Sequence, residues 1–189
     1  MALKLITPAS TYPVTLAEAK LHLRVDGTDE DALISALITS ATEGAEQMTG
    51  RAIMSQTWEL TLDAFPDAFE LTRVPVVSVT SVKYYDSAAV QQTMLNTLYT
   101  LDNTDDFGYA YVVPAYATTW PTTNDQINSV VVRYVCGYAS AAAVPEPIKS
   151  WIKLQIGAMY ANRECEVIER GNVLKLGFVD ALLARYRVY

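Results

Sequence analysis

Residues Asp29–Gly50, DEDALISALITSATEGAEQMTG, decide the fold because their pattern predicts a long amphipathic helix. Three acidic residues open the stretch, where they favour the helix dipole, and Gly50 is a typical helix end. A helix of this kind needs other elements to cover its apolar face, and the flanking sequence must supply them. That face consists of Leu33, Ile34, Leu37, Ile38, Ala41, Ala45 and Met48.

A shorter helix is predicted directly before this stretch, beginning at about Thr15. Thr15 and Glu18 have the spacing of a capping box, in which the hydroxyl accepts from the amide three residues on and the carboxylate reaches back. His22, the only histidine, lies one turn after Glu18, which favours a salt bridge between these two side chains. The apolar face of this helix would consist of Leu16, Ala19 and Leu23.

Beyond Gly50 the apolar residues change from helical to alternating spacing, which predicts strands. One strand begins at Gln56 (QTWELTL), and another covers Val77–Tyr85, where a switch of parity indicates a bulge near Thr80 or Ser81. The turn residues between the strands are typical of an antiparallel sheet. Further strands are predicted at Leu98–Leu101, Tyr109–Val113 and Val130–Cys136.

Two helices are predicted after the strands, one over about Glu146–Arg163 and one from about Phe178 to the end of the chain. The first carries an apolar stripe that is too wide for a single core to cover. We therefore expect part of it to meet another subunit, with Trp151 and Ile152 as candidate interface residues. The stripe consists of Ile148, Trp151, Ile152, Leu154, Ile156, Met159 and Tyr160.

The last residues of the chain, RYRVY, form a second candidate contact surface. Arginine and tyrosine often dominate binding energy, and here they alternate near a chain end. We expect this segment to contact a neighbouring subunit or another protein through Arg185, Tyr186, Arg187 and Tyr189. The alternative is that Tyr186 and Tyr189 pack the segment against its own subunit.

The order of these elements predicts an α+β fold. A helical frame of two N-terminal and two C-terminal helices would be interrupted by an inserted antiparallel β subdomain. We place the N-terminal helix pair in residues 1–54, the β subdomain in 55–138, and the C-terminal helices and tail in 139–189. The outer two segments are expected to pack together as one helical domain.

Composition argues against several classes of function. A net charge of −7 gives nucleic acid no sequence-independent attraction, so stable DNA binding is not expected. No apolar run is long enough to span a membrane, and no secretory signal pattern is present, so synthesis in the cytosol is expected. Hydrophobic residues make up 51% of the chain and charged residues 19%, which favours a surface that meets partners.

No pattern in the sequence predicts an enzyme, a cofactor site or a metal site. His22 would have to activate Cys165 without a nucleophile elbow or an oxyanion loop, and no dinucleotide or P-loop motif is present. Asp102–Asp106 lacks the spacing of an EF-hand loop. Cys136 and Cys165 lie far apart and are expected to be free thiols. Three glutamates lie around a predicted helix end instead of across a cleft: Glu164, Glu166 and Glu169.

An ordered set of segments resembles the tailed-bacteriophage head-tail connector (adaptor) family, in its branch with a β insertion between helix pairs. The set covers nearly the whole chain, which makes it far more specific than any one segment. The segments are PVTLAEAKLHLRVD (13–26), EDALISALITSATEGAEQMTGRAI (30–53), QTWELTLDAFP (56–66), VPVVSVTSVKYYD (74–86), the Trp120–Pro121 pair and VVVRYVCGYASAAAVPEPIKSWIKLQIGAMYANRE (130–164).

The resemblance implies a structural virion protein of the neck, made in the host cytoplasm. About a dozen copies would form a ring beneath the portal protein, extend the DNA channel and offer a docking surface to a neck or tail completion protein. Genome DNA would pass through without specific binding, and no catalysis, cofactor, metal or membrane contact is implied. Glu166–Leu176 matches no motif of the family, and a loop that orders on assembly is one interpretation of it.

A second hypothesis from a different class is a small-ligand or carbohydrate-binding module carried by the β insertion. Trp58, Trp120 and several of the twelve tyrosines would form its aromatic platform. A ligand screen separates the two hypotheses, because a connector would bind no small ligand but would form rings with a portal.

Overall fold

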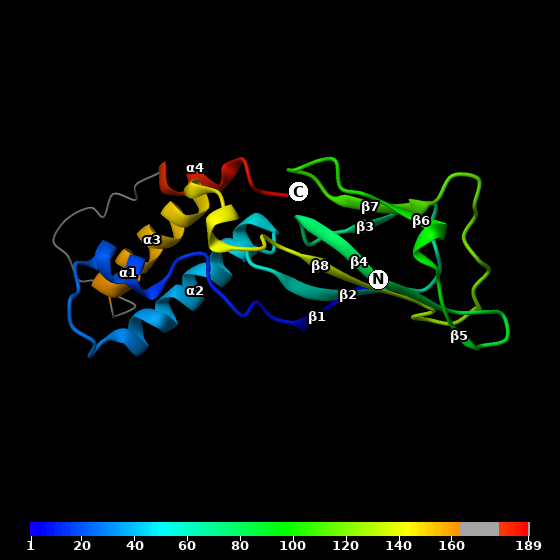
Figure 1. Ribbon diagram of the computed structural model, residues 1–189, viewed down its shortest axis with the longest axis horizontal. Helices are drawn as coiled ribbons and strands as arrows, with labels where there is room; N and C mark the ends of the chain where they lie inside the picture. The colour runs from blue at the N-terminus through cyan, green and yellow to red at the C-terminus, as the bar shows by residue number, and fades with distance from the viewer. Residues whose placement is uncertain (163–177, 189) are drawn as a thin grey trace.

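The computed structural model describes residues 1–162 and 178–188. It confirms the α+β fold, because antiparallel sheets lie between two N-terminal and two C-terminal helices in the described part of the chain. The helices gather at one end of an elongated molecule and the strands at the other (Figure 1). The elements are β1 (Ala2–Thr7), α1 (Leu16–Leu23), α2 (Asp31–Thr49), β2 (Gln56–Leu62), β3 (Phe69–Leu71), β4 (Val76–Tyr85), β5 (Gln91–Thr93), η1 (Asn96–Leu98), β6 (Tyr99–Asp102), β7 (Ala110–Pro114), β8 (Val130–Cys136), η2 (Ala141–Ala143), α3 (Glu146–Ala161) and α4 (Phe178–Ala184).

The capping box of α1 is confirmed. The Thr15 amide donates to the Glu18 carboxylate at 2.7 Å, and the Glu18 amide donates to the Thr15 hydroxyl at 3.2 Å. The expected salt bridge between Glu18 and His22 is not formed, because the carboxylate turns back toward Thr15. His22 lies instead beside Gly157 of α3. A Cβ atom added to Gly157 would lie 3.4 Å from the imidazole Nε2 of His22.

Thr15→Ala is expected to lower the free energy of unfolding by about 0.5–2 kcal/mol, the usual effect of losing a helix cap. The hydrogen bonds from Thr15 also lower the pKa of Glu18 in the folded protein. The stability that these bonds add is therefore present above the pKa that Glu18 has in the unfolded chain, and it is lost as the pH falls through the lower pKa of the folded protein. Urea unfolding of both proteins at neutral and acidic pH measures this. The prediction would be contradicted if the stability difference between the wild type and Thr15→Ala stayed constant or grew in acid.

The strands form two antiparallel sheets, with the orders β1-β2-β8-β4-β5 and β3-β7-β6. β1, β3 and β5 were not predicted from the sequence. The bulge in β4 is confirmed, because its register against β8 shifts between Val79 and Ser81. The expected strand at Leu98–Leu101 begins one residue later, at Tyr99, because Leu98 ends a short 3₁₀ turn.

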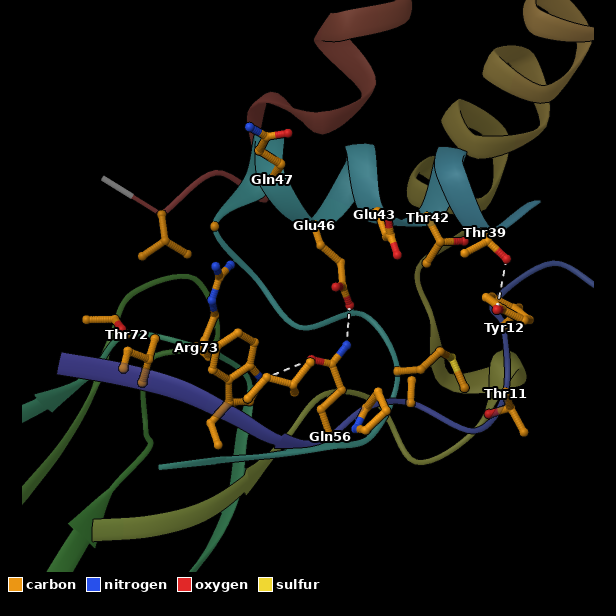
Figure 2. A pocket seen from close by; sticks show the side chains of 18 of the residues that line it. Thr11, Tyr12, Thr39, Thr42, Glu43, Glu46, Gln47, Gln56, Thr72 and Arg73 are labelled. Carbon is orange, nitrogen blue, oxygen red and sulfur yellow. Dashed lines mark hydrogen bonds between the residues drawn. The ribbon is translucent and has the colours of Figure 1, made fainter. Parts of the chain in front are cut away.

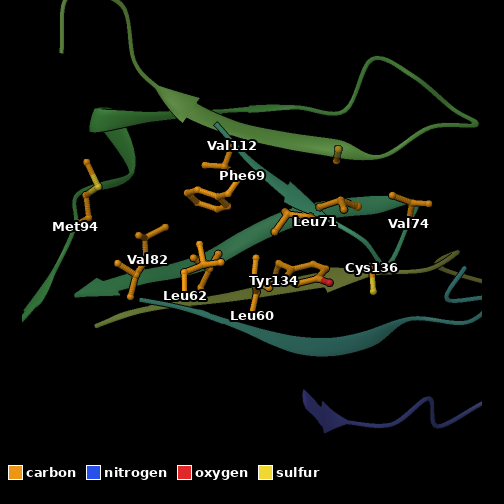
Figure 3. Close-up of a cluster of buried hydrophobic side chains, with 14 of the residues drawn as sticks. Leu60, Leu62, Phe69, Leu71, Val74, Val82, Met94, Val112, Tyr134 and Cys136 are labelled. Atoms are coloured by element: carbon orange, nitrogen blue, oxygen red, sulfur yellow. The ribbon is translucent and has the colours of Figure 1, made fainter. Parts of the chain in front are cut away.

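The two sheets face each other and enclose a hydrophobic cluster (Figure 3). Alternating residues of β2 and β8 point into it, and the short strand β3 adds two more side chains. This alternation explains why β2 and β8 showed a period of two in the sequence. The labelled members are Leu60, Leu62, Phe69, Leu71, Val74, Val82, Met94, Val112, Tyr134 and Cys136.

A second hydrophobic cluster lies among the helices. Both N-terminal and C-terminal helices contribute to it, as expected for one helical unit, and the α2 face predicted from the sequence supplies much of it. The exact boundaries at residues 54/55 and 138/139 stay a prediction, and β1 belongs to the sheet although it precedes the helices. The fully or nearly fully buried members include Ile34, Ile38, Ala41, Ala45, Ile148, Trp151, Ile152 and Ile156.

The prediction that the last helix reaches the end of the chain is wrong. α4 ends at Ala184, and the following residues form a tail that binds the end of α2. The Val188 amide donates to the Thr49 carbonyl at 2.9 Å, a bond that a continuous helix could not make. The other C-terminal helix ends at Ala161, and the expected end at Arg163 lies outside the described residues.

Candidate assembly surfaces

Trp151 and Ile152 lie in the core of the helical end. Trp151 is 4% exposed and Ile152 is 0% exposed, so the chain itself covers both side chains. The Trp151 indole also faces Asp180 of α4, at 3.4 Å from its carboxylate. Their role at a subunit interface stays a prediction, and their burial shows that they stabilise the fold of the single chain.

The remaining part of the α3 stripe is more accessible. Met159 and Tyr160 are half-buried against the helical cluster, and the Tyr160 hydroxyl donates to the Glu30 carboxylate. Leu154 is also half-buried, but it belongs to neither hydrophobic cluster of the described residues. Leu154 is therefore the stripe residue that neither cluster accounts for in the described part of the chain.

The C-terminal tail lies against its own chain, where Arg51 holds it. Arg51 is 1% exposed and donates through Nε to the Tyr186 carbonyl and through a terminal nitrogen to the Asp106 carbonyl, both at 2.7 Å. Burial lowers the pKa of the Arg51 guanidinium, because water no longer solvates its charge. A single buried cation thus joins the end of α2, the loop before β7 and the tail. We call this arrangement the Arg51 clasp.

Phe107 adds an aromatic contact to the Arg51 clasp. The Arg185 guanidinium lies 4.5 Å from the centre of its ring, and the Tyr186 ring lies at 6.1 Å. The Arg187 Nε, by contrast with the Arg185 guanidinium, is buried and has no hydrogen-bond partner among the described residues. Tyr186 packs against the helical cluster, as the alternative for this segment proposed, whereas Tyr189 lies outside the described residues.

A cleft of about 590 Å³ lies where the helical end meets the five-stranded sheet (Figure 2). A chain of polar contacts runs along its floor. Glu46 Oε1 accepts from the Ile53 amide and from Gln56 Nε2, both at 2.7 Å, and Gln56 Oε1 accepts from the Trp58 indole at 2.9 Å. The Arg73 guanidinium covers the Trp58 ring at 5.0 Å. These contacts fix the helical end against the sheet.

Glu46→Gln is expected to make the protein more stable at neutral pH. Burial raises the pKa of Glu46, so the folded protein holds this proton more tightly than the unfolded chain does. The stability that the protein gains by protonating Glu46 is fully present below the ordinary glutamate pKa of 4.5. It is lost as the pH rises through the higher pKa that Glu46 has in the folded protein. Glutamine keeps the Oε1 acceptor without the charge, so its advantage should disappear in acid.

Thermal unfolding of the two proteins across this pH range measures the effect. Glu43→Gln is the matched control, because Glu43 is an exposed carboxylate one turn earlier on the same helix. The prediction fails if Glu46→Gln lowers the melting temperature at neutral pH, or if Glu43→Gln changes stability equally.

The aromatic platform of the ligand-binding hypothesis is not assembled. One face of Trp58 is covered by Arg73, whereas Trp120 stacks on Phe65 at 4.7 Å and lies 5.6 Å from Phe69. The Trp120 indole also donates to the Asp67 carbonyl. Each tryptophan therefore has packing partners of its own, and no observation favours a sugar or small-ligand site.

The residues considered as parts of a catalytic or metal site are also not brought together in the described part of the chain. Cys136 is buried, and burial raises the pKa of its thiol to about 12, while Cys165, Glu164, Glu166 and Glu169 lie outside the described residues. Residues 1–162 and 178–188 contain no cluster of three or more histidine, cysteine or acidic residues suited to a metal ion. Across these same ranges, no helix is long and apolar enough to cross a membrane.

Comparison with known proteins identifies relatives of this fold. The family model described as "Phage gp6-like head-tail connector protein" matches residues 13–112. A chain from the neck of an empty gene transfer agent (GTA) particle, computed with C6 symmetry, is 23% identical with a TM-score of 0.81. A chain from the virion of the native GTA particle is 24% identical with a TM-score of 0.78. A third, from the native neck computed with C12 symmetry, is 22% identical with a TM-score of 0.77.

Each of these three likenesses covers 100% of this chain and 96% of the other chain, so the fold is shared from end to end. No curated protein sequence matches the chain.

Proposed function

The chain belongs to the phage gp6-like head-tail connector family, and from this premise we propose that it is a structural protein of the virion neck. About a dozen copies form a closed ring beneath the portal protein, extend the DNA channel and dock a neck or tail completion protein. The observation that carries the proposal is the family match over residues 13–112 within a fold that is like GTA neck chains over its whole length.

Features of the chain fit a ring. Closed rings need a heterologous contact, in which one face of a subunit meets a different face of its neighbour. Leu154 on α3 offers half-buried apolar surface outside both clusters for such a contact. The net charge of −7 fits a channel wall along which DNA slides without sticking.

Co-sedimentation with the portal protein of the same phage tests this function. The purified chain alone and a mixture with the portal are run on density gradients, and the fractions are examined by native mass spectrometry. We expect a portal complex that contains about a dozen copies of the chain. Separate migration at micromolar concentrations of both proteins would overturn the proposal.

The tail is proposed to contact the portal or a neighbouring subunit. Arg185 is exposed apart from its contact with Phe107, and Arg187 is partly exposed two residues later, so a partner could reach both side chains. Arginine is also well suited to binding carboxylates on another protein.

Two variants test the tail contact by a pull-down with the portal. One lacks Val188 and Tyr189, and the other combines Arg185→Ala with Arg187→Ala. Both should stay folded and bind the portal more weakly. Phe107→Leu is the matched control, because it removes the same Arg185 contact within the chain but keeps both arginines. Full-strength binding by both tail variants would exclude the tail from the interface.

A further inference from the structure

The end of the β half farthest from the helices is made of turns, the short strand β5 and η1 (Figure 1). We call residues 86–98 and 115–128 the β tip. The Ala115 amide donates to the Leu98 carbonyl at 3.0 Å, and the Asn124 amide donates to the Tyr85 carbonyl at 3.1 Å. These bonds join the turn after β7 to η1, and the turn before β8 to the end of β4. The β tip is therefore one connected surface.

The β tip carries an unusual amount of exposed apolar side chain. Tyr116 is 100% exposed, Ile127 is 77% exposed and Leu95 is 67% exposed. The tip accounts for five of the thirteen exposed large hydrophobic residues of the described chain, and the other two are Val90 and Leu98. A surface region that is rich in exposed apolar side chains is a candidate site of interaction.

The β tip is acidic. It contains Asp86 and Asp125 but no lysine or arginine, and the adjoining turn at residues 63–68 adds Asp63 and Asp67. The exposed Lys83 of β4 lies opposite Thr93 at the edge of the tip, so acidic residues still outnumber basic ones on and around it. The Asp63 carboxylate lies directly against the tip, where it accepts from the Asn128 amide at 2.8 Å. Nucleic acid and anionic lipid would be repelled by this surface, whereas a protein surface with lysine or arginine would be attracted.

The β tip is held in shape before any partner arrives. The Asp86 carboxylate accepts from the Ala88 and Val90 amides, both at 3.0 Å, and the Ser129 hydroxyl lies 2.7 Å from the Gln126 carbonyl. Within the tip, Trp120 stacks on Phe65 at the edge of the β core. A surface that is already ordered loses little conformational freedom when it binds.

We propose that the β tip docks the next protein of the neck, through a patch of apolar side chains surrounded by lysine or arginine. This inference rests on the proposed function, because a connector ring must present a docking surface away from the portal. A second copy of the chain is a poorer occupant, since two tips facing each other would bring like charges together.

The test uses head particles whose portals carry the connector, mixed with purified tails of the same phage. The variant combines Tyr116→Ser with Ile127→Ser, at side chains whose exposure makes unfolding unexpected. Leu21→Ser is the matched control, because Leu21 is 81% exposed but lies on α1 at the opposite end of the molecule. A second variant, Asp125→Asn, tests the charge of the tip.

We expect the double variant to bind the portal as the wild type does and to reduce the yield of tailed particles at least tenfold. Leu21→Ser should join tails normally, and Asp125→Asn should lower the yield more at low salt than at high salt. Normal joining by the double variant would overturn the inference. Loss of the ring by the double variant would also overturn it, because the tip would then be a contact between subunits. Failure of the wild type to bind the portal would instead overturn the proposed function.

Discussion

Ile152→Asp is expected to give a chain that does not fold at all. Ile152 is 0% exposed in the helical cluster, so the carboxylate would be buried without a partner. Even Ile152→Ala should cost about 2–5 kcal/mol, which is a large part of the stability of an ordinary domain. Circular dichroism and urea unfolding measure both variants.

Leu154→Asp is the matched variant on the same helix. Leu154 is half-buried outside both hydrophobic clusters, so this change should cost about 1 kcal/mol or less and leave a folded monomer. If Leu154 lies at the ring interface, the folded variant should fail to form rings. A folded Ile152→Asp chain would contradict the described core, and normal rings from Leu154→Asp would exclude this side of α3 as the interface.

Arg51→Ala is expected to lower the free energy of unfolding by about 3 kcal/mol, because each of its two charged hydrogen bonds is worth about 1.5–3 kcal/mol and part of this offsets burial of the charge. The tail should also detach more often, since Tyr186 loses its bond to the guanidinium. Urea unfolding measures the first effect. Trypsin cleavage after Arg185 and Arg187, followed by mass spectrometry, measures the second.

Arg51→Met is the control for size. Methionine keeps most of the buried stem of the side chain but cannot donate to the Tyr186 and Asp106 carbonyls. It should destabilise the protein less than alanine does and should release the tail equally. A methionine variant as stable as the wild type, with a protected tail, would show that the Arg51 clasp contributes nothing.

The sequence alone predicted the elements whose pattern depends on residues that are near one another along the chain. The apolar face of α2, the capping box at Thr15 and Glu18, and the alternation in β2 and β8 depend on neighbours a few residues away. The bulge in β4 was also visible, because a change of parity within one strand is a local signal.

The rest depends on contacts that are distant in sequence. No pattern in the sequence pointed to Arg51, because its partners are the backbone carbonyls of Tyr186 and Asp106, which lie 135 and 55 residues away and leave no trace in side-chain patterns. The same contacts end α4 early. β1 was missed because six residues that pair only with β2 carry too weak an alternation to stand out.

The α3 stripe shows how much of a helix face can be predicted from the sequence. Trp151 and Ile152 were predicted to be buried, and they are, but α1, α2 and α4 use this surface within the same chain. Periodicity identifies the apolar face of a helix and does not identify what covers it. The β tip lacked any periodic signal, because its apolar residues lie in turns.

Electron microscopy of the chain mixed with the portal protein of the same phage would show whether the chain builds a connector ring. We expect a closed ring of about a dozen copies, coaxial with the portal and attached to one end of it, with the β tips on its surface. Portals without added density, beside free monomers of the chain at saturating concentration, would contradict it.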